Sequence, residues 1–290
     1  NKDPYDPANR MKTFKETFED WYKWKFKKPV DAKGKKTSSQ YCSVAAFKHC
    51  QDLHDRVMSK LQATELQEIL DREDLSHSTL EHIKNLFNQM YKYALQFGIV
   101  AKNLSEFVQI GKEDDTEPGV PFTEDELALL WKNKDRPFVD TILIYCYSGW
   151  RLNELARMPL KDIDLVNRKF TGGLKNKYSR NRTVPIQSKI IDMVAARYDP
   201  RFKSLIYHNG IKDISEADYR EQFNQALLDC GITEPHTPHD CRHTCNTLLD
   251  NAEVNRVARY KIMGHAGKDI NEKVYAHKDI NQLRKAIEKI

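Results

Sequence analysis

The feature that most constrains the fold is an acidic segment followed at once by a helix start signal. Residues 113–121 read EDDTEPGVP and contain two prolines and one glycine, a composition typical of an exposed connection. The next residues, FTEDEL, place Thr123 three positions before Glu126 and flank the pair with apolar residues, which predicts a capping box with a hydrophobic staple. The chain therefore divides into a domain over 1–112, a linker over 113–121 and a domain over 122–290.

Apolar residues in the first domain recur at helical spacing and predict a small helical bundle. The last of its helices has Ser78 as its start signal and Gly98 as its stop signal. The predicted helices cover residues 13–26, 39–61, 64–72 and 80–97.

The second domain combines helices with a small sheet. Two short segments, 169–171 and 183–186, flank a basic loop and predict a pair of strands. The predicted fold class is therefore mainly α with a small antiparallel β-sheet. Helical patterns cover residues 124–133, 137–148, 152–158, 188–198, 216–229, 238–250 and 254–263.

Hydropathy and cysteine usage narrow the class of protein. No apolar run approaches the roughly 18 residues that a membrane helix needs, and the first residues lack the apolar core of a secretory signal. We therefore expect a cytoplasmic protein with no membrane partner. The six cysteines lie mostly in apolar periodic segments and are expected to be reduced core residues. The chain begins with asparagine rather than methionine, which suggests a fragment of a longer protein.

The distribution of charge is more informative than the net charge of +5. Residues 21–36 contain seven lysines and one aspartate, and residues 168–182 contain six basic residues and no acid. Aromatic residues lie between these charges, a pattern that suits contact with a phosphate backbone. An ordinary solvated surface is the alternative for either stretch alone.

Residues 237–242 read TPHDCR and combine a helix start with two side chains that can bind an anion. Thr237 suits the N-cap, and Pro238 suits the first helical position. His239 and Arg242 then lie three apart on one face of the first turn, beside free backbone N–H groups. The sequence therefore predicts an oxyanion or phosphate site. A structural zinc site made from the nearby histidines and cysteines is the weaker alternative. The histidine pair, His239 and His243, and the cysteine pair, Cys241 and Cys245, face different sides of the helix.

A second candidate lies in residues 148–155, SGWRLNEL. Gly149 is expected to end one helix, and Arg151 to begin the next. An arginine at a helix start opposes the helix dipole, so it needs a nearby anion, and Glu154 can orient it. A surface arginine paired with a neighbour is the alternative.

Three further positions gain meaning only in combination. Lys175 lies in the loop between the two predicted strands, His265 follows the expected helix stop Gly264, and Tyr275 is one of 13 tyrosines. Taken singly, the lysine is expected to be solvated and the tyrosine to be a packing residue.

In their order along the chain, these motifs resemble those of the tyrosine recombinases, the phage integrase family. The order is G-x-R-x-x-E-L, a lysine in a hairpin, H-x-x-R, Gly-His, and a tyrosine ten residues after the histidine. The string GHAGKDINEKVYAHKD resembles the integrases of conjugative transposons from Gram-positive bacteria. The resemblance covers residues 122–290, and the helical domain over 1–112 is similar to the core-binding domain of the family.

The resemblance implies a site-specific DNA recombinase that cleaves and rejoins DNA through a 3′-phosphotyrosyl intermediate, to integrate and excise a mobile element. It implies no cofactor, metal or ATP. Two arginines would clamp the scissile phosphate, two histidines would donate hydrogen bonds and assist proton transfer, a lysine would protonate the leaving 5′-oxygen, and a tyrosine would attack. These groups are Arg151, Lys175, His239, Arg242, His265 and the nucleophile Tyr275, with Glu154 in a supporting position.

The resemblance also implies partners. These are double-stranded DNA, further copies of the chain (a dimer on each site and a tetramer in the synapse) and, as a further candidate, an accessory factor for excision. The two domains would close around the duplex as a C-shaped clamp, and the amphipathic tail over 281–290 would pack on a neighbouring protomer, with packing on its own chain as the alternative. The residues predicted to contact DNA are Lys23, Lys25, Lys27, Lys28, Lys177, Arg180 and Arg182.

Three other functions remain as alternatives. A type IB topoisomerase-like strand nicker would use the same chemistry without exchanging strands. A catalytically silent DNA-binding regulator would keep the scaffold, although the joint presence of all six catalytic residues disfavours it. A metal nuclease would use the histidines and cysteines of residues 236–245, and its activity would stop in EDTA.

Overall fold

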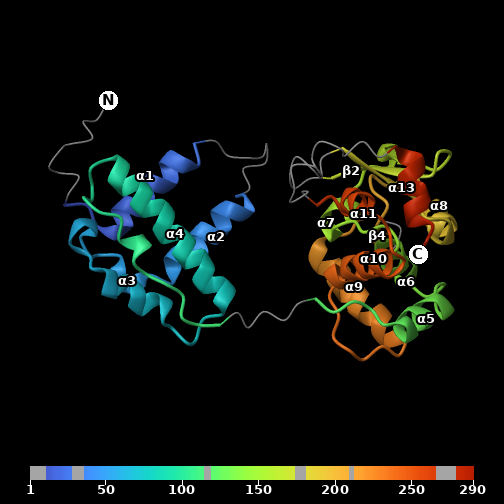
Figure 1. Cartoon of the computed structure of the whole chain (residues 1–290), viewed down its shortest axis with the longest axis horizontal. Coiled ribbons are helices and arrows are strands. Elements are labelled where there is room, and N and C mark those ends of the chain that lie inside the picture. The colour runs from blue at the N-terminus through green and yellow to red at the C-terminus, as the bar shows by residue number, and fades with distance from the viewer. Residues whose placement is uncertain (1–10, 28–35, 114–118, 174–180, 209–211, 266–278) are drawn as a thin grey trace. The chain divides into compact units, whose positions relative to one another are not determined.

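The computed structural model describes all residues except 1–10, 28–35, 114–118, 174–180, 209–211 and 266–278 (Figure 1). The chain forms two compact units, Asn1–Glu117 and Pro118–Ile290. The division falls inside the segment 113–121 that the sequence predicts as a linker. Each unit has its own hydrophobic core.

The first unit is a helical bundle in which α4 (His77–Gln96) contacts the other three α-helices. Ser76 caps α4 by accepting a hydrogen bond from the backbone N–H of Thr79. This cap lies two residues before Ser78, the predicted start signal. Phe87 of α4 is fully buried at the centre of the core. The other elements are α1 (Phe14–Lys25), α2 (Ser38–Lys48), α3 (Ala63–Leu70) and 3-10 turns at Gln51–Leu53, Met58–Lys60 and Leu104–Glu106.

The continuous helix predicted over 39–61 is wrong. The helix α2 ends at Lys48, and the chain continues through two short 3-10 turns. Met58 N donates to Lys12 O at 2.9 Å, so the second turn bonds to the residues that precede α1. This long-range bond satisfies a backbone group that a helix would satisfy locally. Tertiary pairing therefore overrides the helical spacing of this segment.

The second unit is built around α6 (Val139–Cys146), whose last five residues are fully buried. Its neighbours are α5 (Glu124–Lys132), α8 (Ile191–Arg197), α9 (Glu216–Asp229) and α10 (Pro238–Asn251). The remaining helices are α7 (Leu152–Ala156), α11 (Arg256–Met263), α13 (Ile280–Ile287) and 3-10 turns at Leu160–Asp162 and Ser188–Ile190. No helix in the described part of the chain is both long and apolar enough to span a bilayer.

Three antiparallel strands lie beside these helices in the order β1-β2-β3. They are β1 (Ile163–Asp164), β2 (Lys169–Gly172) and β3 (Arg182–Pro185). Phe170 pairs with Val184, and both side chains are fully buried. The prediction of a mainly helical fold with a small antiparallel sheet is confirmed. The sequence did not predict β1 or a second two-stranded sheet, β4 (Tyr207–His208) and β5 (Lys212–Asp213).

The C-terminal helix α13 packs on β3 and α11 of its own chain (Figure 1). The Gln187 side chain donates to the carbonyl of Ile290 at 2.6 Å, and Arg168 pairs with Glu288 at 2.5 Å. Leu283 and Ile287 are buried against the core of the second unit. The amphipathic tail therefore adopts the intramolecular packing that the sequence left open as the alternative.

Candidate active site

Five side chains that carry positive charge or can gain it form a cationic cluster in the second unit. Arg151 precedes α7, Arg182 begins β3, His239 and Arg242 lie in α10, and His265 follows α11. The pKa of His265 is lowered first by desolvation and then by repulsion from the three arginines. The pKa of Arg242 is lowered first by burial and then by repulsion from Arg151 and Arg182. The fold thus brings segments 114 residues apart in sequence (151 to 265) into electrostatic contact.

Arg242 ties the ends of two helices together. Its guanidinium donates to the carbonyl of Gly149, just beyond α6, and to the carbonyl of Met263, the last residue of α11. Carbonyl groups at a helix C-terminus carry partial negative charge and favour a cation. Burial lowers the pKa of Arg242 to about 9, so the side chain stays protonated at neutral pH. Arg242 therefore fixes both the turn before Arg151 and the turn before His265.

Arg151 is held by the carboxylate of Glu154. Glu154 Oε1 lies 3.2 Å from Arg151 Nη1, and Glu154 Oε2 accepts from the Arg151 backbone N–H at 3.4 Å. The side chain of Glu154 is 2% exposed and that of Arg151 is 21% exposed. The glutamate is thus the anion that an arginine at a helix start requires, and it leaves part of the guanidinium accessible.

The structure corrects the expectation for Arg182, which was predicted to contact DNA from a basic loop. Its side chain is only 4% exposed and lies inside the unit. Arg182 Nη2 lies 3.3 Å from Glu154 Oε2, and the guanidinium carbon stands 3.9 Å from the centre of the Trp150 ring. Burial lowers the pKa of Arg182 to about 10, and Glu154 opposes that change. Arg182 is therefore a member of the cationic cluster.

Sequence reasoning missed two contributors to this site. Trp150 is fully buried and provides the surface on which Arg182 stacks. The sequence signal for Trp150 was its position between Gly149 and Arg151 in the motif G-x-R-x-x-E-L. The carbonyl of Met263 receives hydrogen bonds from both Arg182 and Arg242, and a backbone acceptor leaves no signal in a side-chain pattern.

The two histidines of the cluster favour their neutral form. Partial desolvation, followed by repulsion from His243 and Arg242, lowers the pKa of His239, although the residue is exposed. Partial desolvation, followed by repulsion from Arg242, Arg151 and Arg182, lowers the pKa of the exposed His265 to about 4. A neutral imidazole has one N–H donor and one free acceptor nitrogen. At neutral pH each ring can therefore donate a hydrogen bond to an anion or accept a proton.

We expect the pKa of His265, followed by NMR, to lie well below the ordinary value of 6.5 and to rise when sulfate is added. A bound anion offsets the repulsion from the arginines and favours the protonated ring. Between about pH 4 and 6.5, His265 holds fewer protons in the folded protein than in the unfolded chain. The stabilising contribution of neutral His265 is therefore present above pH 6.5 and is lost as the pH falls through this window. A midpoint near 6.5 that sulfate does not move would contradict this electrostatic account.

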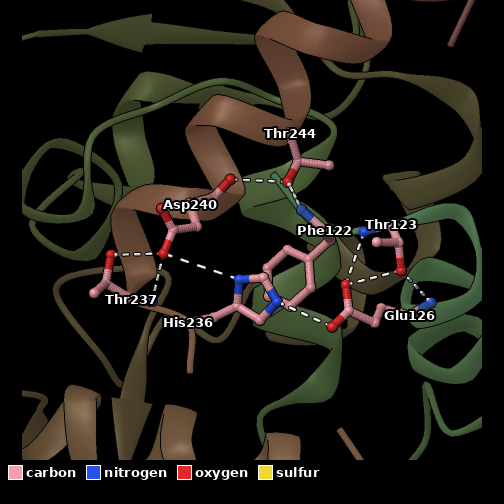
Figure 2. A network of polar contacts seen from close by, with 7 residues as sticks. All are labelled: Phe122, Thr123, Glu126, His236, Thr237, Asp240 and Thr244. Atoms are coloured by element: carbon pink, nitrogen blue, oxygen red, sulfur yellow. Dashed lines mark hydrogen bonds and ion pairs between the residues drawn. The ribbon is translucent and has the colours of Figure 1, made fainter. Parts of the chain in front are cut away.

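A separate polar network fixes the start of α10, which carries His239 and Arg242 (Figure 2). The carboxylate of Asp240 accepts from the backbone N–H of Thr237 at 2.6 Å and from its hydroxyl at 3.0 Å. The predicted N-cap at Thr237, with a proline next to it inside the helix, is thus confirmed. His236, whose side chain is 2% exposed, extends the network to α5.

Figure 2 shows how this network reaches the segment that follows the linker. His236 Nε2 lies 3.1 Å from Glu126 Oε1, and the His236 ring stacks on Phe122 with ring centres 4.0 Å apart. Phe122 N donates to the hydroxyl of Thr244 in α10 at 2.9 Å. A Cβ atom on Gly119 would lie 2.5 Å from the His243 ring and 2.6 Å from Asp240 Oδ1, so a larger residue here would displace side chains of α10. The entry to the second unit is therefore anchored directly on the first turns of α10.

Several predicted site residues lie outside the described residues. They are Lys175 and Tyr275 of the catalytic set, and Lys28, Lys177 and Arg180 of the DNA-contacting set. Lys23 and Lys27 are exposed at the end of the first helix and beyond it. Lys25 is partly buried, with its ammonium 5.0 Å from the centre of the Trp21 ring and 5.1 Å from that of Phe26.

The cysteines and histidines of α10 do not gather around a common point. Within the part of the chain that the structure describes, no three His, Cys, Asp or Glu side chains are grouped so that they could hold a metal ion. Cys241 and Cys245 are fully buried in the core, and burial raises the pKa of the Cys245 thiol to about 12. Thiols in such surroundings are protonated packing residues.

Comparison with known proteins decides the family. The family model described as "Phage integrase family" matches residues 121–282, which is more than half of the chain and almost the whole second unit. The chain belongs to the phage integrase family. The resemblance to tyrosine recombinases that the motifs indicated is thereby confirmed.

Relatives within this family include proteins named tyrosine recombinases and proteins named transposases. The chain is 25% identical to the tyrosine recombinase XerD of Staphylococcus saprophyticus over 230 residues, which are 72% of this chain and 75% of the relative. It is also 25% identical to the transposase from transposon Tn916 of Enterococcus faecalis over 240 residues, 70% of this chain and 59% of that protein. The solved structure of the Tn1549 transposon integrase in complex with circular intermediate DNA shares the fold, with a TM-score of 0.72, 22% identity and coverage of 93% of this chain and 99% of that one.

Proposed function

We propose that this chain is a site-specific DNA recombinase of the integrase or transposase type. It cleaves and rejoins DNA strands through a 3′-phosphotyrosyl intermediate and thereby integrates and excises a mobile element. The observation that carries the proposal is the cationic cluster, which contains the four described members of the family's catalytic set, Arg151, His239, Arg242 and His265. A phosphodiester in transfer carries negative charge on its nonbridging oxygens, and such a cluster stabilises it electrostatically.

Each group has a role that follows from its chemistry. The planar guanidinium groups of Arg151 and Arg242 supply forked hydrogen-bond donors to the phosphate. The Tyr275 oxygen attacks phosphorus and its proton passes to a neutral imidazole of the cluster, while the bond to the 5′-oxygen breaks and Lys175 protonates that oxygen. The bond that forms is a phosphodiester like the bond that breaks, so rejoining is the reverse reaction and needs no ATP.

The partners follow from the same proposal. The first unit acts as the core-binding DNA-binding domain, and the exposed Lys23 and Lys27 contact the phosphate backbone. Affinity for DNA then falls steeply with salt because counterions are released on binding. Each chain carries one nucleophile, so two chains act at one duplex site and four chains exchange strands between two sites. An accessory factor for excision is a further candidate partner.

A nicked suicide substrate that carries a candidate transposon end tests the proposal. Incubation with the protein in EDTA and without ATP is expected to give a covalent protein–DNA band on a denaturing gel. Stable DNA binding with no adduct indicates a silent regulator, and cleavage that stops in EDTA indicates a metal nuclease. Supercoil relaxation without recombination between two sites indicates a topoisomerase-like nicker.

A further inference from the structure

We propose that Arg182 is a positioning residue of this active site. Arg182 holds Glu154 and the Met263–Gly264 turn, and through them it orients Arg151 and His265. The inference rests on the proposed function and adds a residue to its machinery. Arg182 does not touch DNA in this proposal. It acts through the two segments on which it is anchored.

The guanidinium of Arg182 is anchored at three points. Nη2 lies 3.3 Å from Glu154 Oε2, Nη1 donates to the Met263 carbonyl at 3.1 Å, and the flat face lies over the Trp150 ring at 3.9 Å. A lysine ammonium can replace one of these contacts but not the planar combination of them. The side chain is also 4% exposed, so solvent does not compete for these partners.

Arg182 shares a partner with each of the two arginines proposed to bind phosphate. Glu154 receives both Arg151 and Arg182, through Oε1 and Oε2 respectively. The carbonyl of Met263 receives both Arg182 and Arg242. Removing Arg182 would take one cation away from the buried carboxylate of Glu154, which would change how this carboxylate holds the Arg151 guanidinium.

The turn that precedes His265 is shaped around Arg182. Gly264 ends α11 with a φ of 65°, and a Cβ atom at this position would overlap Arg182 Nη1. The next backbone N–H, that of His265, donates to the Tyr260 carbonyl at 3.0 Å and closes the turn. The guanidinium therefore packs directly against the backbone that sets the direction of the His265 ring.

Single-turnover cleavage of the suicide substrate by Arg182→Met, Arg182→Lys and Arg197→Met tests the proposal. Arg197 in α8 is 13% exposed, pairs with Asp140 and faces the Phe138 ring at 5.5 Å, so it is a matched arginine outside the cationic cluster. We expect Arg182→Met to cleave about 10²-fold more slowly with nearly unchanged DNA affinity, Arg182→Lys to recover part of the rate, and Arg197→Met to match the wild type. We also expect the pKa of His265 to shift in Arg182→Met, a change that loss of stability alone would not produce.

A double-mutant cycle shows whether Arg182 acts through Glu154. Because both residues serve the same function, the effects of Arg182→Met and Glu154→Gln on the cleavage rate are expected to be far from additive. The double variant removes both charges of the Arg182–Glu154 pair, so neither of these two is left buried without the other, and the variant is expected to remain slow.

Three outcomes would overturn the inference. They are a wild-type cleavage rate in Arg182→Met or in the double variant, additive effects in the cycle, and a loss that lies wholly in DNA affinity with a weaker salt dependence. The last result would return Arg182 to the DNA-contacting set. Failure of the wild-type protein to form any adduct would instead contradict the proposed function.

Discussion

Replacing Tyr275 with phenylalanine is expected to abolish the covalent protein–DNA adduct and to leave DNA affinity nearly unchanged. Phenylalanine keeps the ring but lacks the oxygen that forms the bond to phosphorus, so the rate of adduct formation falls to background. The measurement is a denaturing gel of the suicide-substrate reaction, combined with a gel-shift titration of the same DNA. Tyr275 lies outside the described residues, and its assignment rests on its place after His265 in the family motif.

Tyr260 provides a matched control for this substitution. It is the described tyrosine nearest in sequence to His265, with its ring centre 6.0 Å from that of His265. Its hydroxyl accepts a hydrogen bond from Arg256 Nε at 3.0 Å. Tyr260→Phe is expected to form the adduct at close to the wild-type rate. An adduct that survives in Tyr275→Phe and disappears in Tyr260→Phe would move the nucleophile to the end of α11.

The starts of α5 and α10 are predictable because local chemistry decides them. Thr123 and Glu126 form the predicted capping box, with the Glu126 carboxylate 2.8 Å from the Thr123 backbone nitrogen. Thr237 and Pro238 begin α10 as expected. In each case the residues that satisfy the free backbone groups lie within four positions of one another, so no knowledge of the rest of the fold is needed.

The position of Arg182 was not predictable, because long-range contacts decide it. In the sequence it ends a run of basic residues that looks solvated. In the fold it meets an aromatic ring, a carboxylate and a backbone carbonyl that come from positions 150, 154 and 263. Long-range contacts also explain why the helix predicted over 39–61 is not continuous, because Met58, in the segment after α2, bonds to Lys12 before α1.

The charges of the cluster explain why the candidate site is suited to an anion. Burial lowers the pKa of Arg182 and of Arg242, repulsion from Arg151 lowers both further, and Glu154 is the carboxylate that opposes these shifts. Arg242 is fixed by hydrogen bonds to the carbonyls of Gly149 and Met263, and Arg182 donates to the same Met263 carbonyl. A preorganised excess of positive charge favours an anion, and preorganised charge is what electrostatic catalysis requires.

Replacing Arg151 with lysine is expected to slow single-turnover cleavage by about 10²–10³-fold while the protein still binds DNA. The guanidinium of Arg151 reaches Glu154 with one nitrogen and keeps 21% of the side chain accessible, so it can hold the glutamate and face a phosphate at once. An ammonium is a single point of charge and cannot offer a planar fork to both partners. The cleavage rate at saturating protein separates this loss from a loss of affinity.

The Arg157→Lys variant tests whether slower cleavage is specific to position 151 or comes from a change in α7. It is exposed at the opposite end of α7, so Arg157→Lys keeps the same change of side chain without altering the cationic cluster. Wild-type cleavage in Arg157→Lys together with slow cleavage in Arg151→Lys supports the phosphate clamp. Equal losses of cleavage rate in both variants would point to a weakened α7. Full activity in Arg151→Lys would show that one point charge suffices and that the forked geometry held by Glu154 has no part in the reaction.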